Sequence, residues 1–106
     1  MQRIFKYKIN KHGKTDIKIK GPHKVLSAGV QGDDLVVWVL MENLQDGVIH
    51  TVEFYSIFTG EGIPHFSEYS ATILQFIDTV QMDNGIVIHV FLRCTEEYAA
   101  KPKICW

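Results

Sequence analysis

The chain has few residues that could crosslink it, and it has no long apolar run. It contains only two cysteines, Cys94 and Cys105, among 106 residues. That is too few for a disulfide framework, and their spacing is not that of a zinc motif, so whether they pair is left open. The longest apolar stretch, Leu35–Met41, is far shorter than the roughly 20 residues that cross a bilayer. No apolar signal segment follows the first residues, so we expect a cytoplasmic protein without a membrane partner.

The overall composition excludes a disordered chain. Hydrophobic residues make up 46% and charged residues 22% of the sequence, a balance typical of a globular protein. A chain of this length can bury one core. We predict a single β domain over residues 1–92, with residues 93–106 as a C-terminal extension.

The first part of the chain alternates apolar and charged residues. This period of two over Phe5–Ile9 and Asp16–Lys20 predicts two strands, each with one face in water. If the turn Lys11–Lys14 joins them in a hairpin, one outward face carries four lysines, which an anion could neutralise: Lys6, Lys8, Lys18 and Lys20. The alternative is that these lysines protect an exposed sheet edge from aggregation.

Two further hairpins follow from turn residues. Gly32-Asp33 predicts a two-residue turn that sets Trp38 opposite Ser27 and Leu26 opposite Val39. In that register the small residues near Trp38 leave room for its indole, so we expect a core aromatic there. This hairpin forms the centre of the predicted fold.

The dipeptide Asn84-Gly85 is the strongest hairpin signal in the chain, because it readily adopts a type I′ turn. A two-residue turn there sets Val80 opposite His89 and places Asp78 diagonal to His89. We expect a strand from Val48 to about Phe58 as well. These patterns predict an all-β, mainly antiparallel fold, a six- to seven-stranded sandwich or small open barrel, with at most one short helix near 67–75.

The loop Thr59–His65 is the segment most typical of a binding site. Its two glycines permit close approach of a backbone, and free N–H groups there could hold an anion. The Glu61 carboxylate would repel a phosphate, and a plain turn is the alternative interpretation. The candidate binding residues in this loop are Thr59, Gly60, Glu61, Gly62 and His65.

No motif in the sequence indicates catalysis. The five histidines lack metal-ligand spacing, and no Ser or Cys nucleophile elbow or paired-carboxylate motif stands out. A histidine such as His89 beside Asp78 is more often structural than catalytic when no nucleophile is nearby. We therefore predict no metal, no cofactor and no enzymatic activity.

Charge divides the chain sharply. Residues 1–24 hold eight basic residues against the single acid Asp16, a net charge of +7, whereas the rest holds three against eleven, a net charge of −8. A basic N-terminal part attracts an anionic ligand or an acidic protein surface. Nucleic acid is a less favoured partner, because the acidic remainder would repel it and few aromatic residues accompany the lysines.

Four short motifs together carry a family resemblance. Lys24–Gln31 followed by Trp38, the loop Phe58–Pro64, the strand Phe76–Met82 and the ending Ile86–Phe91 resemble those of small phage and prophage proteins of unknown function. The likeness spans most of the first 92 residues. It implies a phage-encoded β protein in the cytosol of a bacterial host and does not imply a reaction.

The resemblance and the charge division favour a small non-enzymatic binding protein of a phage. Its expected partner is a host protein, such as a defence effector, or a small anionic ligand, such as the nucleotide signal that activates such an effector. The first alternative is a structural or assembly protein that forms a homo-oligomer through exposed sheet edges. The second alternative is a small hydrolase that uses His89 and Asp78.

Overall fold

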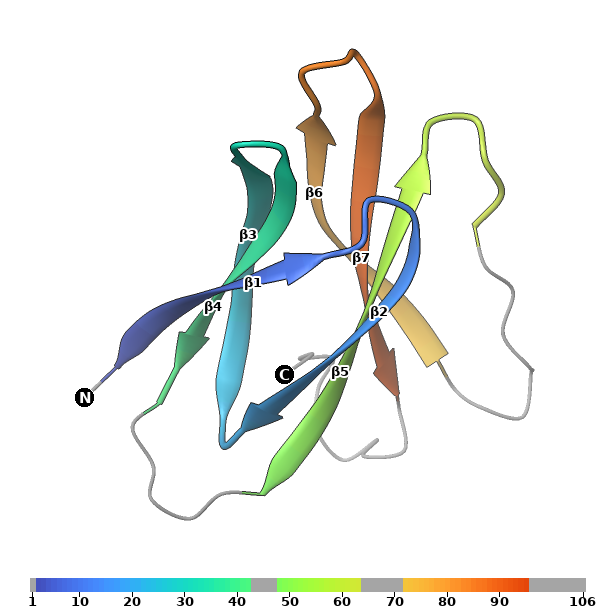
Figure 1. The fold of residues 1–106 in the computed structure, drawn as a ribbon. Helices are drawn as coiled ribbons and strands as arrows, with labels where there is room; N and C mark the ends of the chain where they lie inside the picture. Colours follow the sequence, from blue (N-terminus) through green and yellow to red (C-terminus); the bar gives the residue numbers. More distant parts are fainter. Residues whose placement is uncertain (1, 43–47, 64–71, 96–106) are drawn as a thin grey trace.

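A computed structural model describes residues 2–42, 48–63 and 72–95 of the chain, and these residues contain β-strands and no helix (Figure 1). The all-β prediction is therefore confirmed. The strands run in chain order as β1 (Arg3–Ile9), β2 (Gly13–Lys20), β3 (His23–Gln31), β4 (Asp34–Met41), β5 (Ile49–Phe58), β6 (Thr72–Gln81) and β7 (Val87–Thr95).

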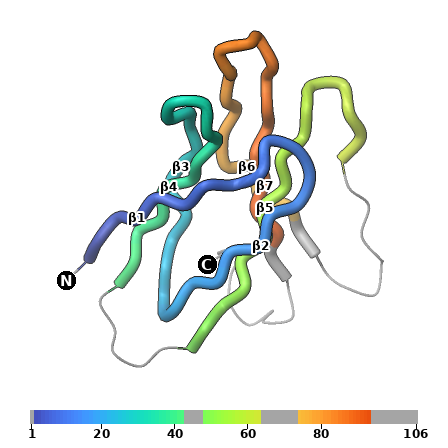
Figure 2. Tube along the Cα trace, viewed as in Figure 1, coloured from blue at the N-terminus to red at the C-terminus, as the bar shows by residue number. Residues whose placement is uncertain are grey.

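The strands form two antiparallel sheets, a three-stranded one in the order β1-β4-β3 and a four-stranded one in the order β2-β5-β7-β6. Of the two predicted architectures, this is the sandwich. Strands β1 and β2 follow each other in the chain yet lie at the edges of different sheets, and their connecting turn passes beside the segment that follows β5 (Figure 2).

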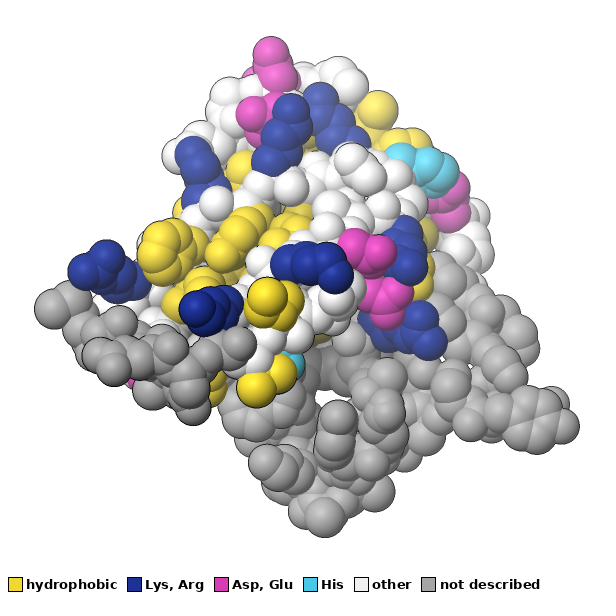
Figure 3. Space-filling model, turned by 60° about the horizontal axis from the view of Figure 1, so that its bottom comes forward, with side chains coloured by type: hydrophobic (Ala, Val, Ile, Leu, Met, Phe, Trp, Pro, Cys, Tyr) yellow, Lys and Arg dark blue, Asp and Glu magenta, His cyan; other side chains and the backbone are white. Residues whose placement is uncertain are grey.

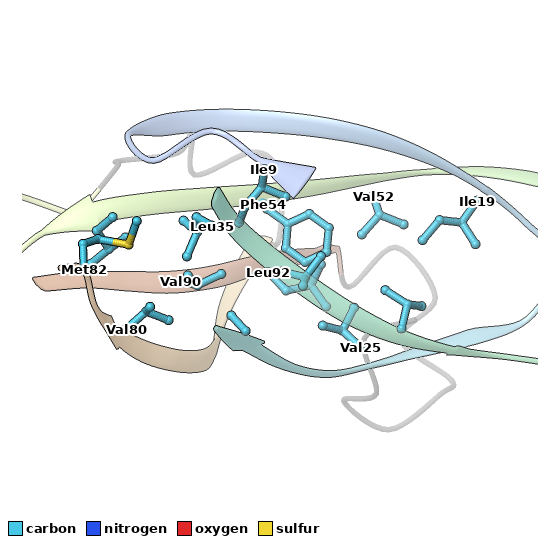
Figure 4. Close-up of a cluster of buried hydrophobic side chains, with 14 residues drawn as sticks. Ile9, Ile19, Val25, Leu35, Val52, Phe54, Val80, Met82, Val90 and Leu92 are labelled. Atoms are coloured by element: carbon cyan, nitrogen blue, oxygen red, sulfur yellow. The ribbon is translucent and has the colours of Figure 1, made fainter. Parts of the chain in front are cut away.

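The core lies between the two sheets and is built from every second residue of their strands. Leu35, Val37 and Val39 on β4 are completely buried, and so is Phe54 on β5 (Figure 4). Burying one such side chain contributes roughly 1.5–3 kcal/mol. The alternation of apolar and polar residues in the sequence thus determines which face of each strand points into the core.

The predicted hairpin between β1 and β2 is wrong. Strand β1 pairs with β4, and β2 pairs with β5. Asn10 lies where the chain crosses from one sheet to the other: its carbonyl accepts a hydrogen bond of 2.7 Å from the buried Ser56 hydroxyl, and its side-chain amide donates one of 3.1 Å to the Lys14 carbonyl. These bonds hold the short connection in its crossing path.

The β3–β4 hairpin has the predicted register near its turn and a shifted one further away. Trp38 pairs with Ser27 as predicted, but Val39 pairs with Val25 because Leu26 forms a β-bulge. The bulge turns Leu26 outward, where it is 40% exposed. Trp38 lies half-buried on the outer face of its sheet and is not a core residue. Its truncation should therefore cost less than the about 3–5 kcal/mol of a buried aromatic.

The β6–β7 hairpin has a three-residue turn where a two-residue turn was predicted. The Met82 N–H donates to the Ile86 carbonyl at 2.8 Å, and the Gly85 N–H donates to the Met82 carbonyl at 2.9 Å. Gly85 has a φ of 87°, as in the common three-residue loop that ends in a left-handed glycine. The extra residue moves the register by one, so Thr79 and not Val80 lies opposite His89.

The last two strands extend beyond the expected ones. Residues 72–75 belong to β6, which agrees with the prediction of at most one short helix near 67–75, and β7 continues to Thr95. The remaining residues of the expected helix, 67–71, lie outside the described residues, as do His65 and Cys105.

Candidate functional site

A tight turn directly after β5 forms the centre of the candidate site. The Glu61 N–H donates to the Phe58 carbonyl at 3.1 Å, and the Phe58 N–H donates to Glu61 Oε1 at 2.7 Å. Gly60 between them has a φ of 95°, a conformation that other residues rarely adopt. The turn therefore holds the Glu61 side chain back against its own backbone.

His12 reaches this turn from the β1–β2 connection. Its Nε2 lies 2.7 Å from Oε2 and 3.0 Å from Oε1 of Glu61. Its ring stacks on Phe58 with 4.5 Å between ring centroids and 25° between the planes. A stacked ring that also contacts a carboxylate has one defined orientation, so His12 is fixed at the site.

The electrostatics of the turn favour the ionised form of Glu61. The Phe58 backbone N–H and then the His12 ring hold the pKa of the Glu61 carboxyl below its ordinary value of 4.5. A hydrogen bond to the charged form of a carboxyl stabilises that form. The carboxylate that sequence reasoning expected to repel a phosphate is thus already in contact with a histidine.

His89 on β7 forms the second part of the site. Its Nε2 lies 2.8 Å from the Thr59 hydroxyl oxygen, and its Nδ1 lies 3.0 Å from that of Thr79. Thr79 is directly opposite on β6, and Thr59 follows the end of β5. Because both ring nitrogens have partners, the imidazole links the ends of three strands.

The predicted pairing of Asp78 with His89 is wrong. The shifted register places Asp78 opposite Val90, and a β-bulge at Ile77 precedes it. Its Oδ2 accepts a hydrogen bond of 3.3 Å from the backbone N–H of Ala28 on β3. Asp78 therefore joins the edges of the two sheets and takes no part in the candidate site.

The four lysines predicted to share one face lie on two different sheets. Lys8 forms an ion pair of 3.2 Å with Asp34, and Lys6 donates a hydrogen bond to Gln31. On the other sheet Lys18 donates to the Thr51 hydroxyl at 3.3 Å, and Lys20 is exposed at the end of β2. Hydrophobic and acidic side chains separate the basic ones on the face shown in Figure 3. The lysines therefore do not make the single patch that the predicted hairpin required.

The structure thus brings together only some of the predicted binding residues. Thr59, Gly60 and Glu61 lie in the turn with the contacts above, and Gly62 is exposed beyond it. Sequence reasoning missed His12 and Thr79. The sequence gives no signal for the contact between His12 and Glu61, which are 49 positions apart. We call the following residues the turn site: His12, Phe58, Thr59, Gly60, Glu61, Thr79 and His89.

Two kinds of feature are not found in the described part of the chain. Within it, no three or more His, Cys, Asp or Glu side chains are grouped so that they could hold a metal ion. No helix within residues 2–42, 48–63 or 72–95 is long and apolar enough to span a membrane.

The comparisons with known proteins place the chain in a family. A family model described as a domain of unknown function, DUF7352, matches residues 1–101. The chain belongs to the DUF7352 family. Neither the curated proteins nor the solved structures include a significant match. The description of the DUF7352 family names no activity, so the function of this member is argued from its residues.

The geometry of the turn site connects three of the sequence motifs. Thr59 comes from the loop motif Phe58–Pro64 and Thr79 from the following strand motif, whereas His89 comes from the last one. These motifs are separated in the chain, yet each gives one side chain to a single hydrogen-bonded set.

Proposed function

We propose that the chain is a small, non-enzymatic, phage-encoded binding protein whose turn site captures a small anionic, nucleotide-like ligand of the host. The observation that carries the proposal is the hydrogen-bonded set Thr59–His89–Thr79, to which three separate motifs contribute. The resemblance to small phage proteins supports the phage origin. A nucleotide that signals to a defence effector has the chemistry expected of such a ligand.

The chemistry of the turn site suits an anionic ligand. A neutral imidazole has one N–H donor and one acceptor nitrogen, so one of the Thr59 and Thr79 hydroxyls donates to His89 and the other accepts from it. The accepting hydroxyl keeps its own proton for a phosphate or carboxylate oxygen. The Glu61 carboxylate is already in contact with the His12 ring, and Lys11 lies next to His12 in the exposed turn. An anion that approaches this end of the sandwich therefore meets a hydroxyl donor and a basic turn.

The bonding of His89 favours binding over catalysis. A histidine that acts as a general base is itself oriented by a third group, most often a carboxylate. In His89 both nitrogens contact threonine hydroxyls, and the carboxylate that could orient it, Asp78, is bonded to Ala28. Thr59 and Thr79 are thus positioned by the imidazole.

Calorimetric titration with a panel of nucleoside mono-, di- and cyclic phosphates tests the proposal. Thr59→Val removes the hydroxyl and keeps the shape, so it should weaken binding about 10- to 100-fold, as expected for a lost hydrogen bond to a charged group. Thr51→Val is the matched control, because Thr51 lies outside the turn site, where it contacts Lys18. Equal affinity of Thr59→Val and wild type would overturn the assignment of the site.

The partner and the alternative assembly role need a second experiment. Size-exclusion chromatography with mass measurement, followed by a pull-down from infected cells, distinguishes a captured host component from a self-associated homo-oligomer. A discrete homo-oligomer that binds no member of the nucleotide panel and retains no host protein would favour the structural or assembly role. If the pull-down retains a host effector and the chain binds no nucleotide, the partner is a host protein and not a nucleotide.

A hydrolase is the second candidate, and one contact favours it. The Thr59 hydroxyl lies 2.8 Å from His89 Nε2, a distance typical of a nucleophile and its base. The contact at His89 Nδ1 does not favour a hydrolase, because the partner there is the Thr79 hydroxyl and not a carboxylate. Specific hydrolysis of a nucleotide or peptide that is lost in a folded His89→Gln variant would establish the enzyme and refute the binding-only proposal.

A further inference from the structure

Strand β3 begins at the end of the sandwich opposite the end of β5, where the turn site lies (Figure 1). His23 begins β3 and is only 4% exposed. Its Nδ1 lies 3.1 Å from the Gly21 carbonyl oxygen, so Nδ1 carries the proton and donates it. Its Nε2 is then an acceptor, and this atom is buried without a hydrogen-bond partner. A buried polar atom of this kind costs about 1–3 kcal/mol and calls for an explanation.

A second histidine faces His23 from the other sheet. His50 near the start of β5 pairs with the inward-facing Ile19, which places it on the inner face of the four-stranded sheet. The ring centroids of His23 and His50 are 5.5 Å apart, with 59° between the planes. The two imidazoles therefore meet between the sheets.

This separation suits a metal bound by both rings. A metal about 2.0 Å from a ring nitrogen lies about 3.2 Å from the ring centre, so two rings at 5.5 Å subtend about 120° at the metal. That angle is the one of a trigonal, three-coordinate site. The hydrogen bond from Nδ1 to a backbone carbonyl is also the usual arrangement of a metal-binding histidine.

Met41 is the candidate third donor. It is the direct partner of His23 across the β3–β4 ladder, so both side chains lie on the inner face, with their Cβ atoms about 4.5–5.5 Å apart. The Met41 sulfur accepts a hydrogen bond of 3.5 Å from the hydroxyl of Tyr7 on β1, the other neighbour of β4, so the sulfur would exchange this contact for the metal on binding. A thioether is a soft ligand, and together with imidazole it selects Cu(I) over harder cations.

We propose that His23, His50 and Met41 bind one Cu(I) ion between the two sheets. The site is independent of the turn site and of any ligand bound there. A metal held by β3, β4 and β5 would join the two sheets at this end of the sandwich. Because metal ligands from separate strands come together only in the folded state, binding should also stabilise the fold.

Competition between the full chain and bicinchoninate for Cu(I), under anaerobic reducing conditions, tests this proposal. Thiols bind Cu(I) strongly, so the titration uses the chain with Cys94→Ser and Cys105→Ser. This chain should bind one Cu(I) and melt at a higher temperature when loaded. His50→Gln should weaken binding by at least about 100-fold, since even outer-shell changes at metal sites cost about 10- to 100-fold.

Matched variants separate the site from other histidines and methionines. Met41→Leu keeps the volume and should remove the sulfur signal from the X-ray absorption spectrum. His12→Gln and Met82→Leu should leave the affinity unchanged, because they lie at the turn site and elsewhere in the core. If the double-serine chain does not fold by circular dichroism, alkylated wild-type protein replaces it. Absence of binding, or binding that survives in His50→Gln, would overturn the proposal.

Discussion

The indole of Trp38 lies directly against Gly29, so that a Cβ atom added to Gly29 would be 2.8 Å from Trp38 Cζ3. No real Cβ contact is that short, and the indole would have to move. We predict that Gly29→Ala destabilises the protein by about 1–3 kcal/mol, the usual cost of overpacking. Urea unfolding followed by tryptophan fluorescence measures it.

The control for this change is Gly62→Ala. A Cβ atom there meets nothing within 4 Å, so stability should change by less than about 0.5 kcal/mol. Equal stability of Gly29→Ala and Gly62→Ala would show that the indole does not rest on Gly29.

Asp78 supports the fold through its bond to the Ala28 N–H. We predict that Asp78→Ala costs about 1–3 kcal/mol, because it leaves a backbone donor of a buried residue without its acceptor. Asp78→Asn keeps an acceptor oxygen and should cost less. Chemical denaturation of both variants, with the exposed turn variant Asp33→Ala as control, provides the measurement, and a loss no greater than that of Asp33→Ala would refute this role.

The turn site should show an acid-dependent stability. The pKa of Glu61 is lowered in the folded protein, so its ionised form contributes stability that is present above the unfolded-state pKa and is lost as the pH falls through the folded-state pKa. The stability difference between wild type and Glu61→Gln should therefore shrink below about pH 4.5. An NMR titration of the Glu61 carboxyl that gave a midpoint at or above 4.5 would contradict the prediction.

The outward lysines of β2 should limit self-association. Strand β2 is an edge of its sheet, and lysines on edge strands disfavour pairing with other chains. We predict that the double variant Lys18→Thr, Lys20→Thr aggregates faster than wild type in light scattering on heating, whereas Lys11→Thr in the β1–β2 turn does not. Unchanged aggregation of the double variant would remove this explanation for the lysines.

Much of the fold follows from local patterns in the sequence. The alternation of Phe5–Ile9 and the Gly32-Asp33 turn predicted strands that the structure contains, because period and turn chemistry act over a few residues. The pairing of Trp38 with Ser27 is confirmed for the same reason. One extra residue in the Asp83–Gly85 turn was enough to change the neighbours of His89, since a shift of one residue moves a side chain to the other face.

The candidate site was predicted only in part. Gly60 marked the turn, because its positive φ favours glycine. The predicted lysine patch failed because β1 and β2 each found a partner elsewhere in the chain, and alternation alone does not specify which strand pairs with which.

The sequence by itself determined the strands, their inward faces, most of the turns and the uneven distribution of charge, all of which depend on neighbouring residues. The tertiary structure alone decided which groups meet across long separations. It brought His12 to Glu61, Asp78 to Ala28 and His23 to His50. Such contacts depend on how two sheets pack and on single-residue bulges, and both are properties of the whole chain.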